Sequence, residues 1–177
     1  DPILSVKLKK RQKTKENQIA KFLDDNNIKY EREVYMDFSC YNSTAGETKS
    51  CRIDFVIYTD KCVIILEIDE GQHKSNTISC ECRRLACILG NQSDVEQKIL
   101  VLRYNPDKFT INNVKVDMKQ SDMMNILKKV ILTYNPVNEK IDILYLFYDL
   151  RIGSDYPKIL FERDYNETLK KCVVPYK

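Results

Sequence analysis

Three carboxylates in the middle of the chain have the residue types and the spacing to do chemistry. Asp54 lies in an alternating segment, and Glu67 and Asp69 end a continuous apolar run that begins near Cys62. Side chains alternate between the faces of a strand, so Glu67 and Asp69 share one face. The short connection 59–61 predicts an antiparallel hairpin between the two segments. The three acids are therefore expected to converge where two strands meet.

Such acids need a positive partner, because an unpaired carboxylate at the end of a buried strand is costly. A hard divalent cation such as Mg²⁺ is held by one or two carboxylates together with water and phosphate oxygens. It can polarise a phosphate, activate water and stabilise a leaving oxygen. From the spacing alone a second interpretation stays open, in which the acids flank a strand end and pair with Lys or Arg.

Hydrophobic periodicity predicts the elements that must position these acids. The predicted strands are 28–38, 52–59, 62–69, 98–103, 141–148 and a short one around 159–161. The predicted helices are one that Thr14 caps and that ends near 24–27, one at 79–89 that Gly90 ends, and one that Ser121 caps. The last helix is expected to bury Met124, Ile126, Leu127, Val130 and Ile131. Residues 39–50 read as a polar loop, and the element order predicts a three-layer α/β/α domain with a mixed central sheet.

Length and composition favour a compact intracellular protein, of the cytoplasm or nucleus. The chain has 177 residues and 43% hydrophobic residues, which fits one domain, here assigned to 14–177. No apolar run is long enough for a membrane span, and the basic N-terminus does not resemble a signal peptide. The segment 1–13 and the residues just after it are basic, with Lys7, Lys9, Lys10, Arg11, Lys13 and Lys15. This cluster either attracts phosphate or is a solvated end.

The seven cysteines do not suggest a disulfide framework, because their number is odd and their spacing irregular. Cys62 and Cys87 lie in apolar patterns and are expected in the core. A structural Zn²⁺ site is conceivable from four others, Cys40, Cys51, Cys80 and Cys82. Their gaps are poor for zinc, so free buried thiols are the favoured prediction.

The motifs around the acids resemble a known family. Arg52-Ile53-Asp54 and the run IILEIDEGQH at 64–73 are similar to the core of PD-(D/E)XK nucleases, nearest to the branch of very-short-patch-repair endonucleases. The likeness continues in SCECRRL at 79–85, VLRYNPD at 101–107 and YLFYD at 145–149. The series is similar to nuclease-like proteins encoded by giant DNA viruses and some protists. It extends from about Thr14 to Asp149.

The resemblance implies a restriction-endonuclease-like core and hydrolysis of phosphodiester bonds in DNA. It places Mg²⁺ (or Mn²⁺) on Asp54, Glu67 and Ile68, with Asp69 assisting. Glu16 on the first helix would be an extra acid that reaches the metal or its water, unless it is simply a solvated side chain. The residues expected to contact nucleic acid are Lys10, Arg11, Lys13, Lys74, Arg84 and Arg103. Alternatively, the two arginines of the core hold the fold by pairing with Glu81 and Asp107.

The sequence also departs from the family pattern. Ile53 replaces the proline before the first acid, and Asp69 stands where the family has a lysine that orients or activates the attacking water. Gln72, His73 or Lys74 must then supply that role, and His73 is the predicted base because its ordinary pKa lies near ~6.5. The missing lysine keeps other functions open: a non-catalytic nucleic-acid-binding module, including an inactive descendant, or a ribonuclease.

Overall fold

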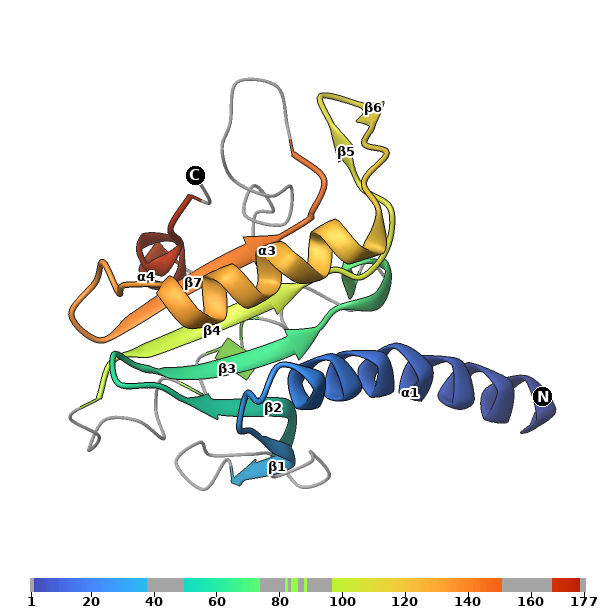
Figure 1. Cartoon of the computed structure of the whole chain (residues 1–177), viewed down its shortest axis with the longest axis horizontal. Coiled ribbons are helices and arrows are strands. Elements are labelled where there is room, and N and C mark those ends of the chain that lie inside the picture. The colour runs from blue at the N-terminus through green and yellow to red at the C-terminus, as the bar shows by residue number, and fades with distance from the viewer. Residues whose placement is uncertain are drawn as a thin grey trace.

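The computed structural model describes residues 2–37, 50–73, 82, 84, 85, 88, 97–150 and 167–175. Within them, five strands form one mixed sheet in the order β1-β2-β3-β4-β7 (Figure 1). Their bounds are β1 (Glu31–Asp37), β2 (Ser50–Tyr58), β3 (Val63–Ile68), β4 (Ile99–Tyr104) and β7 (Ile141–Leu146). The prediction of an α/β protein with a mixed central sheet is confirmed.

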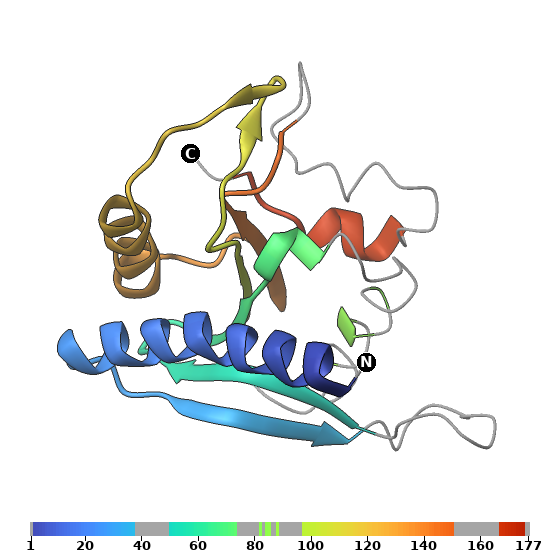
Figure 2. The same ribbon diagram turned by 90° about the vertical axis from the view of Figure 1, so that its right-hand side faces the viewer.

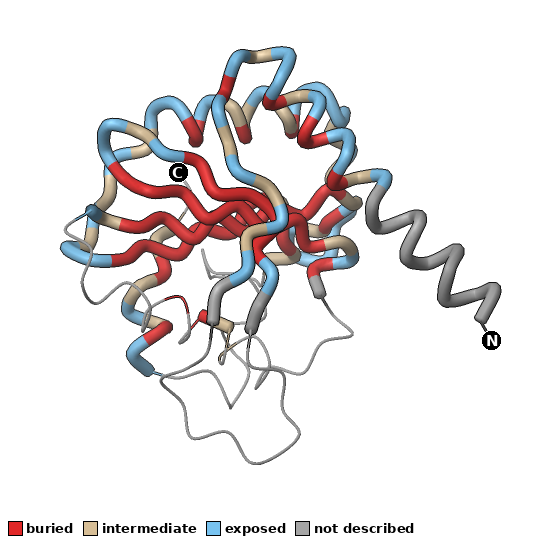
Figure 3. The backbone as a smooth tube through the Cα atoms, turned by 90° about the horizontal axis from the view of Figure 1, so that it is seen from below, coloured by how far each residue is buried: buried red, intermediate tan, exposed pale blue. Residues whose placement is uncertain are grey.

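The sheet has an antiparallel half and a parallel half. β2 pairs with β1 and with β3 in antiparallel orientation, which confirms the predicted hairpin. β3, β4 and β7 are parallel to one another. All residues of these three strands are buried (Figure 3), as expected for β-branched runs covered on both faces. The carboxyl ends of three strands therefore meet at one edge of the sheet.

Helices cover both faces of the sheet. α1 (Pro2–Asp25) and α3 (Gln120–Thr133) pack on one face, where Leu23 and Leu127 join Leu66 in one apolar core. The helical positions 82, 84, 85 and 88 and the short α4 (Glu167–Cys172) serve the other face, where Leu85 and Leu169 join a second core. Figure 2 looks onto the carboxyl ends of the parallel strands and shows α3 and α4 on opposite sides of the sheet, with α1 crossing in front of the strand ends.

Two predicted helix starts are wrong. Thr14 does not cap α1, which runs without a break from Pro2, so the boundary expected at residue 13 falls inside this helix. Segment 3–13 is made of Ile, Leu, Val, Ser, Gln and basic residues and has no Gly or Pro to end a helix, while Pro2 is acceptable in a first turn. Ser121 lies inside α3, whose N-cap is Lys119. The main-chain N–H groups of Asp122 and Met123 donate to the Lys119 oxygen at 3.0 and 3.1 Å, so the helical hydrogen bonds begin before Ser121. Met124 and Ile126 of the predicted stripe are only partly buried.

The structure adds elements that the sequence pattern did not reveal: a hairpin of β5 (Thr110–Ile111) and β6 (Val114–Lys115), the turn η1 (Glu70–His73), and α4. The predicted loop 39–50, most of the helix predicted at 79–89 and the strand predicted at 159–161 lie outside the described residues. Within the described part of the chain, no helix has the length and apolar character needed to cross a membrane.

Candidate active site

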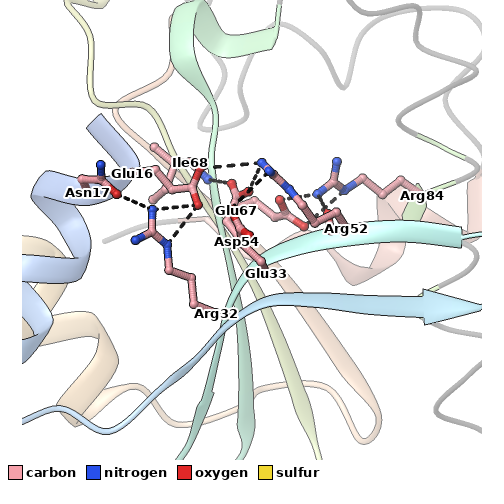
Figure 4. Close-up of polar contacts among 9 residues, drawn as sticks. All are labelled: Glu16, Asn17, Arg32, Glu33, Arg52, Asp54, Glu67, Ile68 and Arg84. Carbon is pink, nitrogen blue, oxygen red and sulfur yellow. Dashed lines mark hydrogen bonds and ion pairs between the residues drawn. The ribbon is translucent and has the colours of Figure 1, made fainter. Parts of the chain in front are cut away.

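The candidate site lies where β2 and β3 separate. The two strands pair from Tyr58↔Val63 to Phe55↔Leu66, while β2 continues toward Ser50 paired with β1. Asp54 is the first residue beyond the last pair, and its Oδ2 accepts a hydrogen bond from the Ile68 main-chain N–H at 2.9 Å (Figure 4). At this fork, the point where β2 and β3 separate, the Asp54 carboxylate takes the place of a main-chain partner for β3. The bond fixes Asp54 beside the end of β3.

β1 is distorted directly opposite this acid. The register passes from Arg32↔Phe55 to Val34↔Ile53 and omits the pair of Glu33 with Asp54. Glu33 has a φ of 55°, in the left-handed region that residues other than Gly rarely adopt. The interruption leaves the Glu33 carboxylate 3.5 Å from the Arg52 guanidinium.

Glu67 is the second acid of the site and is only 1% exposed. Arg84 contacts it with two nitrogens, of which Nε donates to Oε1 at 3.2 Å. Burial raises the pKa of Glu67 to about 7, the positive charges of Arg84 and Arg103 oppose this rise, and the nearby Asp54 adds to it. The site therefore holds a carboxylate that is costly to ionise and gains from further positive charge.

Arg52 connects the fork to the first helix. Its guanidinium lies 3.3 Å from Asp54 and 3.6 Å from Glu16 of α1. Glu16 is only 5% exposed and accepts hydrogen bonds from Arg32 at 3.0 and 3.1 Å. The interpretation of Glu16 as a solvated helix-surface residue is therefore wrong. Figure 4 shows acids and arginines alternating from α1 across the fork to Arg84.

Asp69 is oriented differently from the other two acids. Its Oδ2 accepts hydrogen bonds from Arg103 Nε and from the Tyr148 hydroxyl, and all three residues are buried. Arg103 is the register partner of Glu67 on β4, so it offers Asp69 a fixed positive partner just beyond the strand end. The expected gathering of three acids is not seen in the described part of the chain, where no three His, Cys, Asp or Glu side chains form a metal-binding group.

Both core arginines pair with site acids rather than with the partners suggested by their neighbours in sequence. Arg84 binds Glu67, whereas the alternative partner Glu81 lies outside the described residues. The expected pair of Arg103 with Asp107 is replaced by Arg103 with Asp69. Asp107 instead binds Lys15 of α1 and accepts a hydrogen bond from the Gly71 N–H at 2.8 Å.

The turn η1 follows β3 and carries two of the residues predicted to handle water. Gly71 and Gln72 have φ values of 61° and 59°, and Gln72 Oε1 accepts a hydrogen bond from the Asp149 N–H at 3.0 Å. Gln72 is buried, so its carbonyl oxygen holds the turn against the segment after β7. His73 ends the turn, and its side chain is not among the described ones.

The other predicted residues are placed in part or not at all. The backbone of Lys10, Arg11 and Lys13 lies in α1, with side chains that are not described, and Lys74 is outside the described residues. Of the four cysteines considered for zinc, Cys40 and Cys80 lie outside the described residues, the Cys51 side chain is not described, and Cys82 is half-buried.

Sequence reasoning missed Arg52, Lys15 and Tyr148. Arg52 was recoverable, because it lies two positions before Asp54 and so shares its strand face. Lys15 and Tyr148 contact residues far away in the sequence, and no local signal identifies them.

Comparisons with protein-family models, with curated proteins and with solved structures found no match.

Proposed function

We propose that this chain is a metal-dependent endonuclease that hydrolyses phosphodiester bonds in DNA on a restriction-endonuclease-like core. The observation that carries the proposal is the fork itself, where Asp54 is fixed by the Ile68 N–H beside the buried Glu67. Coulombic repulsion from Asp54 contributes to the raised pKa of Glu67, so the two acids are electrostatic neighbours. Two such acids at a strand end are suited to bind a hard cation.

The donor set fits Mg²⁺ or Mn²⁺. The carboxylates of Asp54 and Glu67 are hard oxygen ligands, and Ile68 can contribute through its main chain, which already lies at the fork. When bound, the cation would act as a Lewis acid on the phosphate and lower the pKa of a water ligand. Arg52 and Arg84 neutralise the charges of the two acids. Their side chains are 40% and 23% exposed, so neither is confined to the core.

The same two arginines can also bind the substrate phosphate. A guanidinium released from a carboxylate has the donor geometry to hold a phosphate in two hydrogen bonds. Arg84 Nη2 also donates to the Arg52 main-chain oxygen at 2.6 Å. Arg84 therefore stays bound to β2 when a cation replaces it as the partner of Glu67. Glu16 positions Arg52 from the side of α1. His73 remains the proposed base, with Gln72 holding its turn in place.

The arrangement of the sheet supports the restriction-endonuclease-like core. A first helix is followed by three antiparallel strands, and the next strand joins in parallel, with helices on both faces. The acids lie on the second and third strands, at the edge where the parallel strands end.

A non-catalytic DNA-binding module is the second candidate, and one observation favours it. Both acids already have arginine partners, and Asp69, which stands where the family has its lysine, is engaged by Arg103. Such a site is close to electrically balanced without a cation, as expected if the chemistry has been lost.

The test incubates the protein with plasmid DNA, single-stranded DNA and RNA, each with Mg²⁺, Mn²⁺ or EDTA. We expect DNA cleavage with either cation, none with EDTA, and none in Asp54→Asn. Asp60→Asn, which makes the same change of charge at an exposed turn between β2 and β3, is the matched control and should cleave normally. Binding without cleavage would establish the DNA-binding module, and cleavage confined to RNA would make the protein a ribonuclease.

A further inference from the structure

The β5–β6 hairpin has no role in the chemistry proposed above, yet it is firmly built. Its register pairs Thr110 with Lys115 and Ile111 with Val114. The two-residue turn, Asn112-Asn113, has φ values of 51° and 65°, which is the geometry that matches the twist of a hairpin. The Val116 N–H donates to the Phe109 oxygen at 3.0 Å, so the ladder continues below the two short strands.

The stem of the hairpin is tied to the turn that follows β3. Asp149 Oδ1 accepts hydrogen bonds from the Thr110 N–H at 2.7 Å and from its hydroxyl at 2.9 Å. The main-chain N–H of Asp149 donates in turn to Gln72 Oε1. The Leu150 N–H donates to the Thr110 oxygen at 3.0 Å. Hydrogen bonds from Thr110 to Asp149 and from Asp149 to Gln72 therefore connect the hairpin to η1. This turn follows the acids of the candidate site directly in the chain.

The hairpin also lies at the edge of the sheet that carries the site. Figure 1 shows β5 and β6 projecting from the end toward which β3 and β4 run. In Figure 2, which looks onto that edge, η1 lies between the hairpin and α1. A long substrate that lies along this edge would extend from the acids toward the hairpin.

The surface of the hairpin is apolar at its tip and basic around it. Ile111 and Val114 flank the turn and are 40% and 69% exposed. The exposed charged residues of the same segment are Lys108, Lys115, Asp117 and Lys119, so lysines predominate. An apolar tip with amide side chains and a net positive charge nearby complements a nucleic-acid groove bordered by phosphates.

We propose that the β5–β6 hairpin enters a groove of duplex DNA next to the phosphate to be cleaved, an inference that rests on the function proposed above. The wide groove of DNA accommodates a two-stranded ribbon, and apolar side chains are commonly placed against base edges there. Ile111 and Val114 contact the bases, Asn112 and Asn113 offer hydrogen-bonding groups at the tip, and Lys115 contacts the backbone. The hydrogen bonds between Thr110 and Asp149 fix the position of the hairpin relative to the site.

The test compares two exposed valines. Val114→Glu adds a negative charge at the tip, and Val137→Glu adds the same charge to a 73% exposed valine in the connection from α3 to β7. Binding to a labelled duplex of 20 base pairs is measured in EDTA for both variants. We expect Val114→Glu to weaken binding by about tenfold or more and Val137→Glu by about twofold. Lys115→Ala and Lys140→Ala, both at exposed positions, form a second pair that does not alter the apolar tip.

Hydrolysis of bis(p-nitrophenyl) phosphate with Mn²⁺ separates the two proposals, because this small diester reaches the acids without touching the hairpin. Val114→Glu should hydrolyse it like the wild type, and its melting temperature should be unchanged. Equal loss of duplex binding in Val114→Glu and Val137→Glu, with diester hydrolysis intact, would overturn the hairpin inference alone. Absence of both diester hydrolysis and plasmid cleavage in the wild type, with selective loss of duplex binding in Val114→Glu, would overturn the catalytic proposal and leave the hairpin as a DNA contact.

Discussion

Two regions of this protein bury carboxylates in opposite ways. At the beginning of β7, Asp142 is fully buried and accepts four hydrogen bonds from neutral donors, at 2.6 to 3.0 Å. The donors are the Tyr134 hydroxyl, the Val137 N–H, and the main-chain and side-chain nitrogens of Asn138. At the other end of the sheet, Asp54 and Glu67 are balanced chiefly by the charges of Arg52 and Arg84.

The difference separates a structural acid from an acid that is available for chemistry. Asp142 is satisfied by a loop folded around it, so removing any partner means rearranging that loop. The partners of Asp54 and Glu67 end in long, partly exposed side chains that can move away when another cation arrives. Asp69 belongs with Asp142 in this respect, because its partners Arg103 and Tyr148 are both buried.

The largest expected effect is on turnover. Asp54→Asn removes a charge from the proposed cation site but leaves an oxygen to accept from the Ile68 N–H, so the fold should persist. We expect cleavage to fall at least about a thousandfold, which corresponds to roughly 4 kcal/mol of lost transition-state stabilisation. The measurement is single-turnover cleavage of plasmid DNA, with the melting temperature as the check on folding. Near-normal cleavage by Asp54→Asn would place the chemistry elsewhere.

The next effect concerns the buried pair beside the site. Arg103→Gln leaves Asp69 buried without its charged partner and should destabilise the protein by about 3–5 kcal/mol in urea unfolding. Lys21→Gln is the control, because Lys21 and Asp25 form an ion pair on the exposed surface of α1, 3.1 Å apart, that should contribute less than about 1 kcal/mol. An equal loss of unfolding free energy in the two variants would mean that Asp69 and Arg103 are not a buried structural pair.

A smaller loss of stability is expected at the structural acid. Asp142→Asn replaces one acceptor oxygen by an NH₂ group that faces hydrogen-bond donors, at a cost of about 1–3 kcal/mol. Cleavage per folded molecule should be unchanged, since Asp142 lies at the start of β7 and not at the site edge. The comparison between the two regions fails if Asp142→Asn keeps its stability and loses its activity.

Per pH unit, the smallest effect is a dependence of stability on pH from Glu67. Its pKa is about 7 in the folded protein and about 4.5 as an ordinary glutamate, so between these values the folded state holds a proton that the unfolded state has released. Stability should therefore fall as the pH rises from about 4.5 to 7, by at most about 1.4 kcal/mol per pH unit, and level off above. Glu67→Gln should remove this slope in urea unfolding from pH 5 to 8. An equal slope in the variant would assign the titration to another group.

Local patterns in the sequence determined most of the sheet. The run at 62–69, the alternation at 52–59 and the three-residue connection specify a buried strand in a hairpin, because strand periodicity and turn length are local properties. The same patterns placed Glu67 at the end of β3 and Asp54 on its partner strand. Helix starts were less well determined, because α3 begins before Ser121, with the Met123 N–H donating to the Lys119 oxygen, despite the capping preference of Ser121.

The tertiary structure alone decided which charges meet. Sequence spacing put Glu67 and Asp69 on one strand face, but the partner of each acid comes from a distant segment: Arg84 for Glu67, and Arg103 with Tyr148 for Asp69. Glu16 likewise reaches the fork only because α1 packs across the sheet and Arg52 extends toward it. A charge interacts over several ångströms in space irrespective of separation along the chain, and so the division between structural and available acids is a property of the fold.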